Sequence, residues 1–247
     1  MPVAAIGIDL GETLIHYGNA PLSWQSLYPA ALRSVAAACG RHLSDEQIVR
    51  GASVLEHYDT RLRPRTEEVT AEEIFGRLLD AWRWPASVSL ERVIGSFFDY
   101  FQNDVACYDD TVPVLAELRR RGLRIGVLTD VPYGMIRARV ARDLEAADSL
   151  GRFVDVLLTS ADVGHRKPAP MGYLRLAEAL GVTLGEMWFV GNENKDVEGA
   201  NAAGSFSVLI DRQETNTGAS VAKARITGLR QLLPLIEGTH ADVPRTG

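Results

Sequence analysis

Four side chains that could carry out chemistry occur along the chain in the order acid, hydroxyl, amine, acid. They are Asp9 in IGIDLGETLI, Thr129 at the end of IGVLT, Lys167 in SADVGHRKPAP and Asp196 in FVGNENKDVEGANAAG. Such a set supports nucleophilic catalysis by a carboxylate. We expect Asp9 to attack an electrophilic phosphorus or carbon, while Lys167 offsets negative charge and Thr129 donates hydrogen bonds to the transferred group.

Each of these residues lies at the end of a predicted strand or shortly after one. Continuous apolar runs predict strands over residues 3–9, 123–129, 154–158, 187–190 and 205–210. Amphipathic segments predict helices over residues 112–121, 169–180, 196–203 and 229–236. This alternation predicts an α/β fold: a three-layer, Rossmann-like core with a parallel sheet and helices on both faces. Ligands of such folds bind beyond the carboxyl ends of the strands, where these residues gather.

Residues 18–106, between the first two core strands, show apolar residues at three-to-four spacing in four segments. Ser44, Thr70 and Ser89 are predicted helix N-caps, and Thr70 with Glu73 matches a capping box. We therefore expect an inserted all-helical domain over 18–106, a core domain formed by 1–17 and 107–238, and a disordered tail over 239–247. The arginines of TRLRPRTEE are expected to form a solvated loop. The aromatic residues of the insertion are expected to form its core: Trp82, Trp84, Phe97, Phe98, Tyr100 and Phe101.

The composition excludes several classes of function. The chain has 247 residues and a net charge of −6, so it lacks the clustered positive charge of a nucleic-acid-binding protein. No apolar run reaches the roughly 20 residues of a membrane span, and no signal-peptide pattern precedes the first strand. The two cysteines, Cys39 and Cys107, lack metal-ligand spacing. We therefore expect a cytoplasmic protein with reduced thiols that binds neither nucleic acid nor a membrane.

The order and spacing of the motifs resemble the haloacid dehalogenase-like (HAD) superfamily over about the whole chain. IGIDLGETL is similar to its first motif, GVLT to its second, GHRKP to its third and VGNENKDVEGANAAG to its fourth. The helical insertion stands where that family places its cap domain. The resemblance implies a hydrolase with Asp9 as nucleophile. It also implies a Mg²⁺ ion held by Asp9, the backbone carbonyl of Gly11, Asn192 and Asp196.

Two positions depart from the phosphatase pattern of this superfamily. Gly11 stands where its phosphatases have a second Asp, which protonates the leaving alcohol and then activates water. Asn192 stands where the fourth motif usually has an acid, which implies a weakened Mg²⁺ site. Glu12 could replace the missing acid, but the interpretation that we favour places it at the start of a turn, facing solvent. Asp130 is expected to be a loop acid near the site rather than a catalyst.

The resemblance leaves three functions open. The favoured one is a Mg²⁺-dependent phosphatase of a small phosphorylated metabolite, working through an aspartyl-phosphate and weakened by the lost acid, which typically contributes about 10²–10⁴-fold. A 2-haloacid dehalogenase needs neither the second Asp nor a metal, but such relatives carry Ser-Asn where this chain has Thr129 and Asp130. The third is a HAD-fold protein that binds a ligand without catalysis. Phosphonoacetaldehyde-type C–P cleavage needs a cap lysine, and residues 18–106 contain none.

Overall fold

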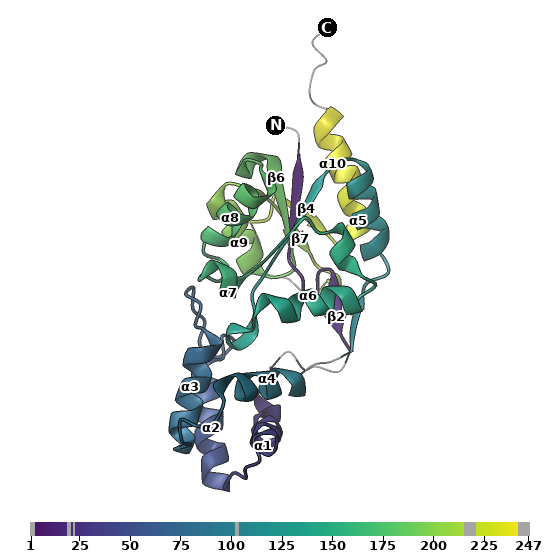
Figure 1. Ribbon diagram of the computed structural model, residues 1–247. Coiled ribbons are helices and arrows are strands. Elements are labelled where there is room, and N and C mark those ends of the chain that lie inside the picture. The colour runs from purple at the N-terminus through teal and green to yellow at the C-terminus, as the bar shows by residue number, and fades with distance from the viewer. Residues whose placement is uncertain (1–2, 19–20, 22, 102–103, 215–220, 242–247) are drawn as a thin grey trace.

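The central sheet carries the predicted motifs, and within the described residues it has six parallel strands (Figure 1). The computed structural model describes residues 3–18, 21, 23–101, 104–214 and 221–241. The strand order is β5-β4-β1-β6-β7-β8, so the N-terminal strand lies at the centre of the sheet. The strands are β1 (Ala5–Ile8), β4 (Arg124–Thr129), β5 (Val156–Thr159), β6 (Met187–Gly191), β7 (Phe206–Ile210) and β8 (Ala224–Ile226).

Helices cover both faces of this sheet (Figure 1). Ile6 and Ile8 of β1 pack into one apolar layer, and the alternate residue Ala5 packs into the other. The first layer holds α5 (Thr111–Arg120), α6 (Arg137–Ala146) and α10 (Leu232–Ala241), and the second holds α8 (Met171–Leu180) and α9 (Asn194–Ala203). A single helical turn, α7 (Ser160–Val163), follows β5. The predicted three-layer, Rossmann-like α/β core is confirmed.

The inserted helices form a separate block below the sheet in Figure 1, with an aromatic cluster of their own. After a 3-10 turn, η1 (Gln25–Leu27), the block contains α1 (Tyr28–Ala38), α2 (Asp45–Tyr58), α3 (Ala71–Trp82) and α4 (Leu90–Tyr100). Trp82, Phe97, Phe98 and Phe101 are buried in it, as predicted, whereas Trp84 is half-buried and Tyr100 is exposed, which differs from the prediction. We call this block the cap. Within the described ranges, no helix has the length and apolar character needed to cross a lipid bilayer.

The helix starts of the cap follow the predicted capping residues. Ser44, Thr70 and Ser89 are the N-caps of α2, α3 and α4, and each side chain accepts a backbone N–H three residues on. The reciprocal capping box, however, is formed by Ser44 with Gln47. The Glu73 carboxylate lies 3.5 Å from the Tyr58 hydroxyl and 3.5 Å from Arg77, and no reciprocal bond to Thr70 completes the predicted box.

A short antiparallel ribbon joins the cap to the core. β2 (Ile15–Tyr17) pairs with β3 (Val105–Cys107), so the chain leaves the core and returns to it side by side. The predicted domain borders at 17/18 and 106/107 run along this ribbon. At the other end of the chain, α10 continues to Ala241, three residues into the segment expected as a tail, and residues 242–247 lie outside the described residues.

Four elements of the described chain had no sequence signal strong enough to predict them. β2, β3 and β8 have three residues each, which is too short for an alternating pattern to be recognised. Helix α6, RARVARDLEA, is mostly charged, and only Val140 and Leu144 are buried. The predicted helix over 229–236 is a 3-10 turn, η5 (Leu229–Gln231), followed by α10.

The loop after β4 fastens the cap to the core. Tyr133 of this loop packs inside the cap cluster, and its hydroxyl is bonded to that of Tyr28. Gly134 has a φ of +67°, and a Cβ added to it would lie against Ala71 N and 2.6 Å from Val69 O. Only glycine fits this close approach without strain. The same loop begins beside Thr129, so the cap docks directly onto a motif-bearing segment.

Substituting Gly134→Ala should therefore destabilise the protein beyond the usual cost of a left-handed alanine. That cost is about 1–2 kcal/mol, and the collision with the cap backbone should raise the loss to roughly 3 kcal/mol or more. Gly40→Ala is the matched control, because Gly40 has a φ of +66° and nothing within 4 Å of an added Cβ. Urea unfolding of both variants measures the difference, and equal losses would contradict the close packing of this loop.

Candidate active site

Asp9 directly follows the central strand, at the edge of the sheet where a ligand is expected. Its backbone N–H donates to Val190 O of β6 at 2.8 Å, and its Oδ1 lies 2.5 Å from Lys167 Nζ. The Asp9 side chain is only 10% exposed. Burial raises the pKa of its carboxyl, and the positive charge of Lys167 limits that rise. Asp9 is therefore a desolvated carboxylate with one strong ionic partner.

Lys167 joins the first motif to the fourth. Its Nζ lies 2.5 Å from Asp9 Oδ1 and 2.6 Å from Asp196 Oδ1, and its side chain is 3% exposed. Burial lowers the pKa of Lys167, but the surrounding carboxylates, Asp196 first, outweigh burial and hold that pKa well above its ordinary value. The ammonium group stays protonated, and two carboxylates share its charge.

Asp196 holds Lys167 and the start of α9, which differs from the metal-ligand role that the resemblance implies. It is 1% exposed and does not line the cavity beside Asp9. Its Oδ1 forms the ion pair with Lys167, and its Oδ2 accepts the backbone N–H of Glu193 at 2.9 Å. Because both oxygens are engaged away from the cavity, we leave Asp196 out of the metal-ligand set and treat it as the residue that positions Lys167.

Thr129 and Asp130 bring the second motif to the same edge of the sheet. Thr129 ends β4 and lines the cavity. Asp130 is buried too: its Oδ1 accepts the Lys167 backbone N–H at 3.1 Å, and its Oδ2 lies 3.2 Å from Lys195 and 3.9 Å from Arg166. Burial acts to raise the pKa of Asp130, but the positive charges of Lys167, Arg166 and Lys195 outweigh it, and the pKa is lowered. Asp130 is thus a loop acid beside the site, as expected, and its side chain is buried and paired with cations.

Oxygen atoms that could hold a metal ion lie beside Asp9. The Thr13 hydroxyl is 3.5 Å from Asp9 Oδ2 and 3.3 Å from Asn192 Oδ1, so these two oxygens face a common point. Gly11 lines the same cavity. Mg²⁺ prefers oxygen ligands and commonly uses one or two carboxylates together with substrate phosphate, which this set fits. Among the residues that the structure describes, no group of three or more His, Cys, Asp or Glu forms a denser metal site.

Gly11 leaves room for the acid that it replaces. A Cβ added at this position would meet no atom within 4 Å. Its φ also lies outside the left-handed region, so a side chain would not strain the backbone there. Packing would therefore tolerate a carboxylate side chain at position 11, which is an open position on the cavity wall.

Glu12 lies in the predicted turn, but its carboxylate belongs to the cavity wall rather than to open solvent. Its φ is +56°, and its Oε2 accepts a hydrogen bond from Tyr108 at 2.8 Å. The guanidinium of Arg212 lies 3.8 Å from the centroid of the Tyr108 ring and is itself paired with Asp110 at 2.9 Å. Tyr108, which packs against the Arg212 guanidinium, thus fixes the direction of the Glu12 carboxylate.

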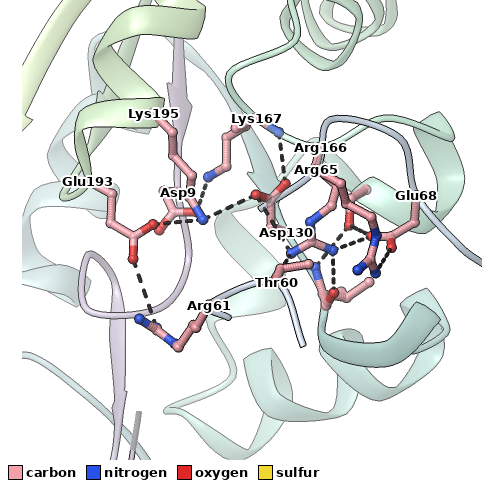
Figure 2. A network of polar contacts seen from close by, with 12 residues as sticks. Asp9, Thr60, Arg61, Arg65, Glu68, Asp130, Arg166, Lys167, Glu193 and Lys195 are labelled. Atoms are coloured by element: carbon pink, nitrogen blue, oxygen red, sulfur yellow. Dashed lines mark hydrogen bonds and ion pairs between the residues drawn. The ribbon is translucent and has the colours of Figure 1, made fainter. Parts of the chain in front are cut away.

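The cap reaches the core beside Lys167 through the loop between α2 and α3 (Figure 2). The Glu68 carboxylate is 3% exposed, pairs with Arg166, and accepts the Ser160 hydroxyl. From the same loop, Arg61 extends to within 3.9 Å of Glu193 and lines the cavity. The prediction of a solvated arginine loop is therefore incomplete, because this loop closes one side of the site.

Several of these residues had no signal in the sequence. Arg166 stands in the third motif, directly before Lys167, and only that neighbourhood could have drawn attention to it. Glu68, Tyr108 and Arg212 are separated from their partners by 98, 96 and 102 positions respectively. No local spacing rule relates residues so far apart, so their pairing is visible only in the folded chain.

The site opens into a cavity of about 760 Å³ between the cap and the core. This volume lies within the range of about 300–1,000 Å³ that is common for small-molecule sites. The core side presents the motif residues already described. The cap side presents Trp24, Phe98 and Phe101, so two aromatic residues expected only in the cap core also face the cavity.

The chain belongs to the haloacid dehalogenase-like hydrolase family, whose model matches residues 3–204. This match agrees with the resemblance seen in the sequence, and it spans both the cap and most of the core. The site just described is therefore the candidate active site of a HAD-family protein.

Two curated relatives carry phosphatase names. Phosphatase MT3486 of Mycobacterium tuberculosis (strain CDC 1551 / Oshkosh) is 42% identical over 105 residues, which cover 42% of this chain and 46% of that protein. The phosphoglycolate phosphatase of Escherichia coli (strain K12) is 32% identical over 122 residues, which cover 47% of this chain and 46% of that protein. The chain spans about half the length of these curated relatives.

Solved structures share the whole fold. A HAD phosphatase from Thermococcus onnurineus has a TM-score of 0.62 at 23% identity, and covers 96% of this chain and 99% of its own. A 2-haloacid dehalogenase from Pseudomonas syringae pv. Tomato DC3000 has a TM-score of 0.65 at 21% identity, with the same coverages of 96% and 99%. At these identities the likeness shows the fold alone, and one fold accommodates both named activities.

Substituting Arg166→Met should destabilise the protein strongly, because it leaves the buried Glu68 carboxylate without its cation. The expected loss is about 3–5 kcal/mol in the free energy of unfolding. Arg77→Met is the control: Arg77 pairs with Glu73 at 3.5 Å, but the two side chains are 63% and 51% exposed. That change should cost less than about 0.5 kcal/mol. Denaturant unfolding of both variants tests the contrast, and similar small losses would contradict a buried ionic anchor.

Proposed function

We propose that this protein is a magnesium-dependent phosphatase that hydrolyses a small phosphorylated molecule through a phosphoryl group carried on Asp9. The observation that carries the proposal is the buried Asp9 carboxylate, paired with Lys167 at 2.5 Å and facing a cavity that the cap covers. The phosphatase names of the two curated relatives support the same reaction class.

The residues of the chain suit two successive displacements at phosphorus. Asp9 would attack the phosphorus; the bond to the substrate oxygen breaks, and its electron pair leaves with that oxygen. Lys167 and the Thr129 hydroxyl would contact the phosphoryl oxygens and offset their charge. Water would then attack the phosphorus on Asp9, which releases inorganic phosphate and restores the carboxylate.

Mg²⁺ would be held by Asp9, the Gly11 carbonyl and Asn192. When bound, it supplies positive charge that reduces the repulsion between a carboxylate nucleophile and an anionic phosphate. Because this set contains a single carboxylate, we expect weaker binding than at a site with two or three.

Glu12 is the carboxylate best placed to take the proton of the attacking water. It lines the same cavity as Asp9, and the Tyr108 hydroxyl fixes it at 2.8 Å. A general base must lie within hydrogen-bond reach of the proton that it removes, either directly or through one water molecule. The proposed role of Glu12 as general base can be tested separately from the role of Asp9 as nucleophile.

The first experiment measures hydrolysis of 4-nitrophenyl phosphate with Mg²⁺ and with EDTA. We expect turnover that EDTA abolishes and excess Mg²⁺ restores, and a loss of at least about 10³-fold in Asp9→Asn. Asp109→Asn is the matched control, because Asp109 is exposed and does not line the cavity. Turnover that survives Asp9→Asn, or no turnover of any phosphate ester, would contradict the proposal.

Substituting Glu12→Gln tests the base. Removal of a general base should lower kcat by about 10²-fold or more, with KM changed only slightly. Tyr108→Phe keeps the carboxylate and removes only its hydrogen bond, so the expected loss is smaller. The two variants are compared by steady-state kinetics, and a Glu12→Gln enzyme with unchanged kcat would exclude Glu12 from this role.

The second candidate function is hydrolytic removal of halide from a 2-haloacid. Gly11 fits this reaction, because halide leaves without a proton. Dehalogenase relatives carry Asn where this chain has Asp130, and the negative charge of Asp130 is paired with Lys195 at 3.2 Å and Arg166 at 3.9 Å. Halide release from 2-chloropropionate, measured on the preparation used for phosphate release, separates the two reactions. Loss of both activities would favour a protein that only binds its ligand.

A further inference from the structure

The cap side of the cavity is a platform of aromatic rings. We call Trp24, Phe98 and Phe101 the aromatic wall; all three line the cavity. The rings of Trp24 and Phe101 are stacked, with centroids 4.1 Å apart and planes 5° apart. The Tyr133 ring, 5.9 Å from Trp24, supports the stack from the loop that docks the cap. Phe98 and Phe101 are almost fully buried, so the partly exposed Trp24 is the ring of the wall that offers surface to another flat ring, in offset or edge-on contact.

The charges that line the cavity are balanced. Six acidic and six basic side chains contribute to its walls. Arg142 is one of the charges that oppose the burial-raised pKa of Asp143. The other five basic side chains lie within 4.0 Å of a carboxylate oxygen: Arg61 of Glu193, Arg139 of Asp99, Lys167 of Asp9, Lys195 of Asp130, and Arg212 of Asp110. Five of the six basic side chains in the described lining are therefore neutralised by a carboxylate, and the lining as a whole offers no net positive charge to a second anionic group on the substrate.

The open position at Gly11 restricts the leaving group. No side chain at position 11 can protonate the departing oxygen, and the mechanism proposed above uses Glu12 only as the base for the attacking water, so an oxygen that leaves readily as an anion is favoured. A phenolic oxygen meets this demand, because a phenol such as the tyrosine side chain ionises near pH 10. An aliphatic alcohol is about as weakly acidic as water, whose pKa is ~15.7, and leaves far less readily without an acid.

We propose that the substrate is the phosphate monoester of an uncharged phenol, with its ring against the aromatic wall and its phosphate at Asp9. The proposal rests on the phosphatase function above. In the reaction an Asp9 oxygen–phosphorus bond forms, the phosphorus–aryl oxygen bond breaks, and the electron pair leaves with the phenoxide, which then takes a proton from water. Phosphoglycolate, for which one group of relatives is named, differs in having an alkyl leaving group and a second negative charge.

A series of phosphate monoesters tests the preference for an uncharged aryl phosphate on the unaltered, Mg²⁺-loaded enzyme. Phenyl and benzyl phosphate both carry a ring but differ in the acidity of the leaving oxygen. Phenyl and 4-carboxyphenyl phosphate differ chiefly in charge, and ethyl phosphate has no ring. We expect kcat/KM for phenyl phosphate to exceed that for benzyl phosphate, ethyl phosphate and phosphoglycolate by at least about 10²-fold, and that for 4-carboxyphenyl phosphate by about 10-fold.

The outcomes separate this proposal from the one on which it rests. Hydrolysis of phosphoglycolate, ethyl phosphate or benzyl phosphate as fast as phenyl phosphate would overturn the aryl substrate and leave the phosphatase intact. Failure to hydrolyse any ester of the series would overturn both.

Trp24→Leu tests the aromatic wall. It should raise KM for phenyl phosphate about 5- to 10-fold through loss of a ring contact of about 1 kcal/mol, with kcat within twofold and no change in KM for ethyl phosphate. Trp84→Leu is the matched control, because Trp84 belongs to the cap but does not line the cavity. Equal effects of the two substitutions, or an equal rise in KM for both esters, would overturn ring recognition by the wall.

Gly11→Asp tests the leaving-group argument in the opposite direction. The new carboxyl has space at this position. It should increase the rate of hydrolysis of benzyl phosphate more than that of phenyl phosphate. We expect the preference for phenyl over benzyl phosphate to fall at least 10-fold. An unchanged ratio in a variant that unfolds at the same temperature as the natural chain would overturn the assignment of the preference to Gly11.

Discussion

The buried ammonium group of Lys167 lies between the carboxylates of Asp9 and Asp196, and the rest of the site depends on this contact. Two carboxylates brought together away from water would raise each other's pKa and favour protonation. Burial raises the pKa of Asp9, and the Lys167 ammonium, which lies between the two carboxylates, opposes that rise. Removing one partner of such a buried group leaves an uncompensated charge, which costs much more than the loss of a surface ion pair. The position of the nucleophile is therefore set by segments from three separate parts of the chain.

The cap is attached to the same segments that carry the chemistry. Arg166, next to Lys167, binds the cap residue Glu68, and Tyr133 and Gly134, a few residues after Thr129, pack against the cap. A movement of the cap would therefore displace the second and third motifs together. A buried ion pair is weak evidence for extra stability, but it does select one arrangement of its surroundings. In this protein that arrangement covers Asp9 and leaves a defined cavity.

This site differs from the site of a phosphatase with two acids because it lacks a carboxylate at position 11, and packing does not explain that difference. Gly11 has space for a carboxylate and lacks one, while the neighbouring Glu12 is held on the cavity wall by Tyr108. Without an acid at position 11, the identity of the leaving group gains weight in selecting the substrate. The fold itself does not decide the question, because it hosts phosphatases and dehalogenases alike, and the residues around the nucleophile do.

The sequence by itself determined the layered α/β core, the helical insertion and the four motifs, because apolar periodicity and strand-end residues are local patterns. The meeting of Asp9, Thr129 and Lys167 at one edge of the sheet was predicted in this way. Only the tertiary structure decided that Asp196 holds Lys167 instead of facing the cavity, that Asp130 is buried and paired, and that Glu68, Tyr108 and Arg212 brace the site. The contacts of Glu68, Tyr108 and Arg212 join residues roughly a hundred positions apart. No local pattern encodes which distant side chains will meet once the sheet and the cap have packed.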